Sequence, residues 1–283
     1  MLFPEKQENN DFPSHQPVLL AIAGYDPSGG GGVLADIRTA RFCNVRAIAA
    51  VTAVTAQNTR QIIQVQTVTS DMLKAQLELL RMEFSIQAVK IGMLASTTLI
   101  ETVADFLQTL PFSIPVVFDP VLKASAGMLL LQAPVESLLR LFPRCTLLTP
   151  NLPELAQLAE IPEIDAMQNR EYAVARLHKR GAHAVLVKGG HDVSDTVTDT
   201  LHIPGLPPKI FSSPRTDLAD TRGTGCFLSS AIAAALLRGF SLEKAVLYAR
   251  KQLLRHATER WQPSANAGKL FSDFSPKGIR DNP

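Results

Sequence analysis

The stretch PVLLAIAG at residues 17–24 is a short apolar run that ends in glycine, and it predicts a buried strand. A glycine-rich loop, DPSGGGG at 26–32, comes next, and VLADIRTARFCNV at 33–45 then carries apolar side chains at helical spacing. RAIAAVTAV at 46–54 predicts a second strand. A strand, a helix and another strand in this order are typical of a parallel βαβ unit.

The same alternation continues along the rest of the chain. Further strands are expected at 61–68, where the alternation favours an exposed edge, and at 88–92, 115–119, 146–150, 182–190, 197–203 and 209–213. Further helices are expected at 71–83, capped by Ser70 or Asp71, and at 97–110, 133–142, 152–159, 165–181, 223–239 and 241–259. The pattern predicts an α/β fold with a doubly wound, mostly parallel central sheet flanked by helices on both faces.

Length and patterning predict a single domain over residues 17–271. The chain has 283 residues, with no repeat and no central linker. The polar, proline-containing start at 1–16 lacks the apolar segment of a signal peptide, so we expect a flexible leader there and a flexible tail at 272–283. No apolar run approaches the roughly 18 residues that indicate a membrane span.

Charge and cysteine content exclude several classes of function. The formal net charge is only +2, and lysine and arginine form no run interleaved with aromatic residues, which gives no indication of nucleic-acid binding. The three cysteines are widely spaced and include no CxxC pair, so a zinc knuckle or a disulfide framework is not expected. A reducing, cytoplasmic setting fits best.

Unusual residues gather where the predicted strands end. In a doubly wound sheet, ligands bind beyond the carboxyl ends of the strands. The segments that fall at this edge are 24–32, 92–93, 119–127, 149–154, 188–191 and the turn at 220–226. The sequence therefore predicts one ligand site along this edge.

The stretch DTRGTGCFLSS at 220–230 places a Gly-Thr-Gly turn directly before a helix of small residues. Gly223 and Gly225 allow close approach of the backbone, and the helix start attracts negative charge, which favours an anion cradle. The alternative is a simple helix-initiating turn. Cys226 follows the turn, where the helix end is expected to lower the pKa of its thiol. It is either a chemically active group or a small buried apolar residue.

Two further segments carry polar groups with two interpretations each. Asn151 and Glu154 in TPNLPE are able to hold the water shell of Mg²⁺, or to form a capping box at a helix start. Lys188 in VKGG lies at the end of an apolar strand, where it either reaches a polyphosphate or extends from the rim of the sheet into water. Residue type alone leaves these alternatives open.

The first loop and the second strand add two more candidates. Asp36 lies in an otherwise apolar helix start, which indicates either a polar contact or an ordinary surface charge. Gln57 follows the second strand, and its amide is able to hydrogen-bond a heteroaromatic ring in both senses, or simply belongs to a polar loop.

Taken in order, GYDPSGGGG, TAVTAQNT, KIGML, DPV, TPNLPE, VKGGH and DTRGTGC resemble the hydroxymethylpyrimidine/phosphomethylpyrimidine kinases of thiamin biosynthesis, members of the ribokinase-like superfamily. The resemblance covers about residues 17–257. It implies ATP-dependent phosphorylation of 4-amino-5-hydroxymethyl-2-methylpyrimidine and then of its monophosphate, with Mg²⁺, in an enzyme that usually forms homodimers. It implies no nucleic-acid or membrane partner.

The resemblance also implies roles for single residues. The residues that would surround the pyrimidine are Gly24, Asp36, Gln57, Met93 and Val121. The residues that would meet ATP are Lys188, Asn151 and Thr224, and those that would organise Mg²⁺ are Glu154 and Asp119 together with Asn151. The turn from Gly223 through Gly225 would form an anion hole, with Cys226 as the base where most superfamily relatives carry aspartate.

Three positions depart from the family pattern. Where the family usually reads DPVMVAKSG, this chain reads DPVLKASAG, so Ser125 occupies the position of the family's lysine and Lys123 lies two residues earlier. Phe227 stands where a small hydroxyl residue is usual, and Tyr25 replaces threonine or serine. We expect these changes to bear on the second phosphorylation and on the width of the pocket.

Three alternatives follow from the same residues. The first is another kinase of the superfamily, such as a pyridoxal kinase, whose substrate is also an aromatic ring with a hydroxymethyl arm. The second is a non-catalytic pyrimidine-binding relative that keeps the fold. The third is acyl transfer through Cys226 as a nucleophile, with His183 or His191 as the candidate partner.

Overall fold

The computed structural model describes residues 17–124, 127–190, 195–215, 221–256 and 260–271. Within these residues, nine strands form one sheet in the order β3-β2-β1-β4-β5-β6-β7-β8-β9. These strands are β1 (Val18–Tyr25), β2 (Arg46–Gln57), β3 (Ile62–Thr67), β4 (Ile86–Ile91), β5 (Val116–Phe118), β6 (Leu147–Leu148), β7 (Ala184–Val187), β8 (Thr196–His202) and β9 (Lys209–Pro214). The six central strands, which are β2, β1, β4, β5, β6 and β7 in sheet order, run parallel. Strand β3 at one edge and strands β8 and β9 at the other are antiparallel additions.

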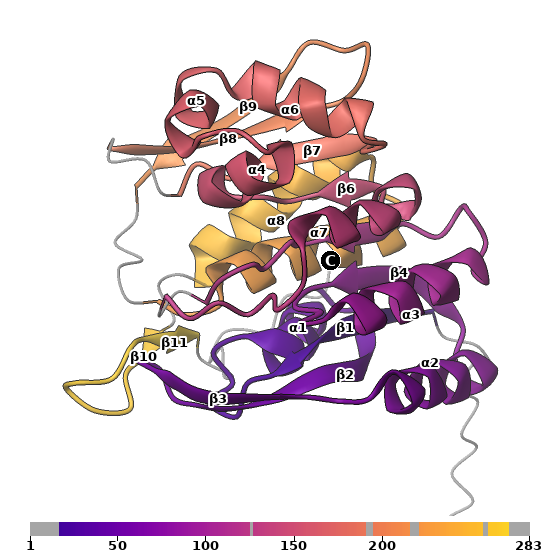
Figure 1. Ribbon diagram of the computed structural model, residues 1–283. Helices are drawn as coiled ribbons and strands as arrows, with labels where there is room; N and C mark the ends of the chain where they lie inside the picture. Colours follow the sequence, from indigo (N-terminus) through magenta and orange to yellow (C-terminus); the bar gives the residue numbers. More distant parts are fainter. Residues whose placement is uncertain (1–16, 125–126, 191–194, 216–220, 257–259, 272–283) are drawn as a thin grey trace, which may run out of the picture.

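Helices cover both faces of this sheet (Figure 1). The helical elements are α1 (Gly32–Phe42), α2 (Ser70–Glu83), α3 (Thr97–Gln108), the 3-10 helix η1 (Val135–Arg144), α4 (Leu152–Ala159), α5 (Glu163–Gln168), α6 (Arg170–Lys179), α7 (Thr224–Leu237) and α8 (Leu242–His256). One apolar core lies under α2 to α6, and a second lies under α1, α7 and α8. The predicted doubly wound α/β fold is confirmed.

The expected elements differ from the observed ones at four places. The helix expected at 133–142 is the 3-10 helix η1, which contains Pro143, a residue without an N–H to donate. The helix expected at 165–181 divides into α5 and α6, and Asn169 caps the second. Thr69, rather than Ser70 or Asp71, caps α2. A short hairpin of β10 (Arg260–Trp261) and β11 (Leu270–Phe271) was not expected.

The predicted leader at 1–16 and tail at 272–283 lie outside the described residues. The strands from β1 to β9 share one sheet, and the single domain over 17–271 stays a prediction. None of the helices in the described part of the chain has the length and apolar character needed to span a lipid bilayer.

The fold turns the side chain of Phe227 away from the edge of the sheet where ligands are expected. Phe227 is 1% exposed, and its ring packs 5.2 Å from that of Phe271 and 6.4 Å from that of Phe42, measured between centroids. His256 lies 5.7 Å away in the same cluster. The departure at Phe227 therefore fills the core between α1, α7 and the C-terminal hairpin, and the expectation that it adds bulk to the pocket is wrong.

Replacing Phe227 by serine, the small hydroxyl residue usual in the family, is expected to lower the free energy of unfolding by about 3–5 kcal/mol, because a buried aromatic ring is lost. Urea unfolding followed by circular dichroism measures the change. Phe112→Ser is the matched control: Phe112 is 76% exposed and contacts Arg144 by a cation–π interaction, so a loss of no more than about 1 kcal/mol is expected. Stability left intact in Phe227→Ser would contradict the assignment of this ring to the core.

Candidate active site

A cavity of about 820 Å³ opens along the carboxyl ends of the central strands. It lies where the strand order reverses, since β1 is followed on one side by β2 and on the other by β4. Twelve of the thirteen site residues predicted from the sequence line this cavity. They are Gly24, Gln57, Met93, Asp119, Val121, Asn151, Glu154, Lys188, Gly223, Thr224, Gly225 and Cys226.

The start of α7 is held against the glycine-rich loop by backbone contact. Gly223, the N-cap residue, has φ +80, in the left-handed region that favours glycine. A Cβ atom at Gly223 would lie 2.0 Å from the carbonyl oxygen of Gly30, so only glycine fits. The first amides of a helix have no partner within the helix, and those of α7 belong to residues that line the cavity. The turn has the geometry of an anion site.

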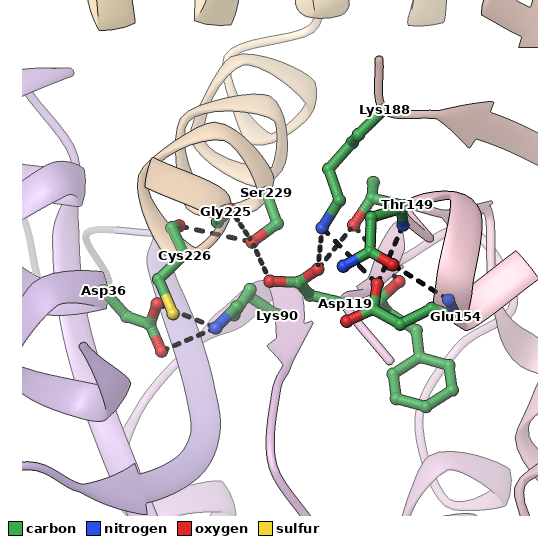
Figure 2. A network of polar contacts seen from close by, with 11 residues as sticks. Asp36, Lys90, Asp119, Thr149, Glu154, Lys188, Gly225, Cys226 and Ser229 are labelled. Atoms are coloured by element: carbon green, nitrogen blue, oxygen red, sulfur yellow. Dashed lines mark hydrogen bonds and ion pairs between the residues drawn. The ribbon is translucent and has the colours of Figure 1, made fainter. Parts of the chain in front are cut away.

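Asp119 is the centre of a polar network at the edge of the sheet (Figure 2). Its carboxylate is 2% exposed and accepts hydrogen bonds from Lys188 Nζ at 2.7 Å, Thr149 Oγ1 at 3.2 Å and Ser229 Oγ at 3.4 Å. Burial acts to raise the pKa of Asp119, but the charges of Lys188 and Lys90 outweigh it and lower the pKa. Asp119 is therefore an anion inside the protein.

Asn151 and Glu154 form the capping box that the sequence offered as one of two interpretations. The Asn151 side chain accepts from the Glu154 amide at 2.8 Å, and the Glu154 carboxylate accepts from the Asn151 amide at 2.8 Å. Glu154 also lies 3.8 Å from Lys188 Nζ, and both line the cavity. Burial raises the pKa of Glu154 to about 7, against the charge of Lys188 and with that of Asp119. The capping box thus places at the site a carboxyl group that is an unusually weak acid.

The donor set suits Mg²⁺ that arrives with phosphate groups. Among the described residues, no group of three or more histidine, cysteine, aspartate or glutamate side chains is placed to hold a metal ion alone. Mg²⁺ commonly takes one or two carboxylates and completes its shell with water and substrate phosphates. Asp119 and Glu154 flank Lys188 in this arrangement. They fit a cation shared with a bound polyphosphate.

Asp36 lies beneath the cavity instead of lining it. Its side chain is wholly buried and pairs with Lys90 Nζ at 2.8 and 2.9 Å, and it accepts a hydrogen bond from Ser230 Oγ at 2.8 Å. It is not the surface charge that the sequence left open, and the predicted contact with a pyrimidine is not formed by this geometry. The reason is that Lys90, which pairs with Asp36, is the residue of this pair that lines the cavity.

Cys226 lies in the first turn of α7, with its sulfur pointing toward the Lys90 ammonium (Figure 2). The expected lowering of the thiol pKa by the helix end is wrong. Burial raises the pKa of Cys226 to about 11, against the attraction of Lys90 and with the repulsion of Asp36 and Asp119. Loss of solvation is the largest influence on this half-buried thiol, and it favours the protonated form.

The structure also places the other residues that depart from the family pattern and the histidines considered for acyl transfer. Tyr25 and Lys123 line the cavity, whereas Ser125 lies outside the described residues. His183 is exposed and does not line the cavity, and His191 also lies outside the described residues. Acyl transfer through Cys226 thus gains no described histidine partner.

The sequence analysis did not identify two charged pairs. The first pair joins Lys90 and Asp36. Lys90 was part of a predicted strand, and a lysine within the apolar run AVKIG was the available signal. The second pair joins Arg250 and Asp199, both lining the cavity. Asp199 accepts a hydrogen bond at 2.8 Å from the Gly189 amide, which fixes the turn after Lys188. Nothing in the local sequence links positions 199 and 250.

Comparisons with known proteins agree on one family. Residues 26–270 match the family model described as phosphomethylpyrimidine kinase. A hydroxymethylpyrimidine/phosphomethylpyrimidine kinase of Mycobacterium tuberculosis is 41% identical over 262 residues, which cover 92% of this chain and 94% of that protein.

Solved structures with the same fold carry two different names. The ADP complex of Bacillus subtilis pyridoxal kinase is 28% identical, with a TM-score of 0.79, over 92% of this chain and 98% of that one. A phosphomethylpyrimidine kinase from Clostridium difficile is also 28% identical, with a TM-score of 0.71, over 85% of this chain and 98% of that one.

Alkylation of Cys226 by iodoacetamide, in protein without added substrates, is expected to keep rising with pH beyond pH 9. A thiol with a pKa of about 11, against 9.0 for an ordinary one, holds about 100-fold less thiolate at neutral pH. Peptide mass spectrometry separates Cys226 from Cys43 and Cys145, and the same peptide in urea-unfolded protein is the reference. An alkylation midpoint at or below that of the unfolded protein would contradict the burial argument.

Proposed function

The chain belongs to the phosphomethylpyrimidine kinase family, and we propose that it phosphorylates 4-amino-5-hydroxymethyl-2-methylpyrimidine with ATP and then adds a second phosphate to the monophosphate. One observation carries this proposal: a single cavity is lined by Gln57 and Met93, by Lys188 and the first residues of α7, and by Cys226. Phosphoryl transfer requires mainly positioning and neutralisation of charge, and the cavity offers both.

The pyrimidine is proposed to lie near Gly24, Gln57, Met93 and Val121, which all line the cavity. A Cβ atom at Gly24 would lie 3.1 Å from the sulfur of Met93, so the absence of a side chain there keeps this wall open to a flat ring. The Gln57 amide both donates and accepts, which suits an aminopyrimidine edge. Asp36 supports this end from below rather than touching the ring.

The phosphates of ATP are proposed to lie between the start of α7 and Lys188. The helix start offers amide donors at Gly223, Thr224 and Gly225, and Lys188 offers an ammonium group on a side chain that is 14% exposed to solvent. Asn151 fixes the carboxylate of Glu154, which together with Asp119 would hold Mg²⁺. When bound, Mg²⁺ would neutralise charge on the transferring phosphate.

Cys226 is proposed to act as the base. As the substrate hydroxyl oxygen bonds to the γ-phosphorus, its proton passes to the Cys226 thiolate, and the bond from the γ-phosphorus to the bridging oxygen breaks to release ADP. The thiolate is the minor form at neutral pH, since burial raises the pKa of Cys226 to about 11. General-base help of this kind is worth about 10²–10⁴-fold in rate.

A pyridoxal-type kinase is the second candidate, and the similarity to the Bacillus subtilis pyridoxal kinase favours it. Pyridoxal also presents an aromatic ring with a hydroxymethyl arm to the same kind of site. The 41% identity to a named hydroxymethylpyrimidine/phosphomethylpyrimidine kinase supports the pyrimidine as the preferred substrate. Phe227 leaves the cavity unobstructed, which removes one reason for a non-catalytic protein.

The purified chain is expected to consume ATP with the hydroxymethylpyrimidine and with its monophosphate, and to act less well on pyridoxal. Cys226→Ala is expected to lower kcat by about 10²–10⁴-fold with the substrate KM largely kept, because the base is lost while the binding surfaces remain. A coupled ADP assay measures turnover, and chelation of Mg²⁺ is expected to stop it.

Outcomes with the two pyrimidines separate the steps. Turnover of the hydroxymethylpyrimidine alone would restrict the proposal to the first step and point to the loop that begins at Lys123. Binding of the pyrimidine without ATP consumption would contradict the enzymatic proposal. Pyridoxal preferred over both pyrimidines would support the second candidate.

We further propose that the enzyme is a cytoplasmic homodimer, in line with the family resemblance. Light scattering on the purified chain is expected to give about twice the chain mass of 30.7 kDa. A mass equal to one chain at micromolar concentration would contradict the dimer.

A further inference from the structure

Lys90 is a lysine without exposure to solvent, placed one residue before the end of a central strand. Its side chain is 0% exposed, yet the ammonium group reaches the wall of the cavity. A Cβ atom at Gly92 would lie 2.9 Å from Lys90 Nζ, so the glycine two residues later leaves the space that the ammonium occupies. The strand end is shaped around a buried cation.

Asp36 holds this cation, and Ser230 from a second element holds Asp36 in turn. Asp36 on α1 accepts from Lys90 Nζ with both carboxylate oxygens, at 2.8 and 2.9 Å. Ser230 on α7 donates to the same carboxylate at 2.8 Å. Cys226 and Ser230 are four residues apart in α7, so they lie on one face of the helix and both turn toward the Asp36–Lys90 pair.

The pair remains ionised despite its burial. Burial is the largest single influence and acts to lower the pKa of Lys90, but the charges of Asp36, Cys226 and Asp119 and the hydrogen bond to Asp36 together outweigh it, and the pKa is raised. A lysine whose pKa is raised above its ordinary value is protonated across the neutral range. Lys90 therefore presents a permanent positive charge to its neighbours.

Charged groups from several elements face the Cys226 sulfur. Lys90 from β4 attracts a thiolate, and the Gly32 amide at the start of α1 donates a hydrogen bond to it. Asp36 from α1 and Asp119 after β5 repel it. Lys188 after β7 also interacts with it. Lys90 is the largest influence that favours the charged form of Cys226.

We propose that Lys90 is a positioning residue for the base: held by Asp36, which Ser230 holds in turn, its ammonium group stabilises the Cys226 thiolate that receives the substrate proton. This inference goes beyond the proposed function and rests on it only in naming Cys226 as the base. Lys90 acts through the sulfur, and Asp36 acts through Lys90 by holding it in place while opposing its charge. The two partners therefore have opposite electrostatic effects on the thiol.

The test compares alkylation rates of Cys226 in the full-length protein between pH 7.5 and 10, without substrates. Well below the pKa of a thiol, each unit of pKa shift changes the thiolate fraction about tenfold, so rate ratios report the shift directly. Lys90→Met is expected to slow alkylation at every pH.

A double variant keeps the test free of folding artefacts. Lys90→Met alone leaves Asp36 as a buried carboxylate without its cation, which is strongly destabilising. Lys90→Met combined with Asp36→Asn removes both charges and is expected to fold, while still alkylating Cys226 more slowly than the native protein. Lys74→Met, at an exposed lysine on α2, is the matched control and is expected to change nothing.

A folded double variant with an unchanged alkylation profile would overturn the proposal, since Lys90 would then serve the fold alone. A folded double variant that alkylates Cys226 more slowly than the native protein would support it. Alkylation requires no turnover, so a protein that fails to phosphorylate pyrimidines would refute the proposed function and leave this test readable.

Discussion

The ion pair between Lys90 and Asp36 is the constraint on which the site depends. Neither side chain is exposed to solvent, and their positions are 54 residues apart in the chain. Two charges without water are tolerated only when each is fully paired. The pair therefore fixes α1 against β4, and Ser230 adds α7 to the same contact. Any packing that separated these elements would leave a buried charge unpaired.

From this pair the charges alternate across the cavity floor. Asp36, Lys90, Asp119 and Lys188 follow one another from α1 to β7, with Cys226 facing Lys90 and Glu154 facing Lys188. Such an arrangement holds its groups in position before any ligand binds. A polyphosphate with Mg²⁺ would enter at the Lys188 end, and a hydroxymethyl ring at the end near Cys226. Preorganised charge of this kind is the main resource of phosphoryl-transfer sites.

The sequence predicted the fold and the location of the site because both depend on local patterns. Apolar runs and glycine turns define strands such as PVLLAIAG and the start of α7, and the ends of parallel strands meet at one edge. Side-chain environment was not predictable in the same way. The pKa of Cys226 depends on burial by α1 and β4. The family resemblance assigned Asp36 to the pyrimidine, whereas its partner in the fold, Lys90, lies 54 residues away in the sequence. Long-range pairs such as Arg250–Asp199 leave no trace in local spacing.

A crystal structure with a non-hydrolysable ATP analogue, Mg²⁺ and the hydroxymethylpyrimidine would test the central claim most directly. The account predicts the substrate hydroxyl oxygen within about 3.5 Å of both the Cys226 sulfur and the γ-phosphorus, with the phosphates at the start of α7. It also predicts the Asp36–Lys90 pair unchanged beneath them. A hydroxyl group directed away from Cys226, with another side chain in reach of its proton, would contradict it.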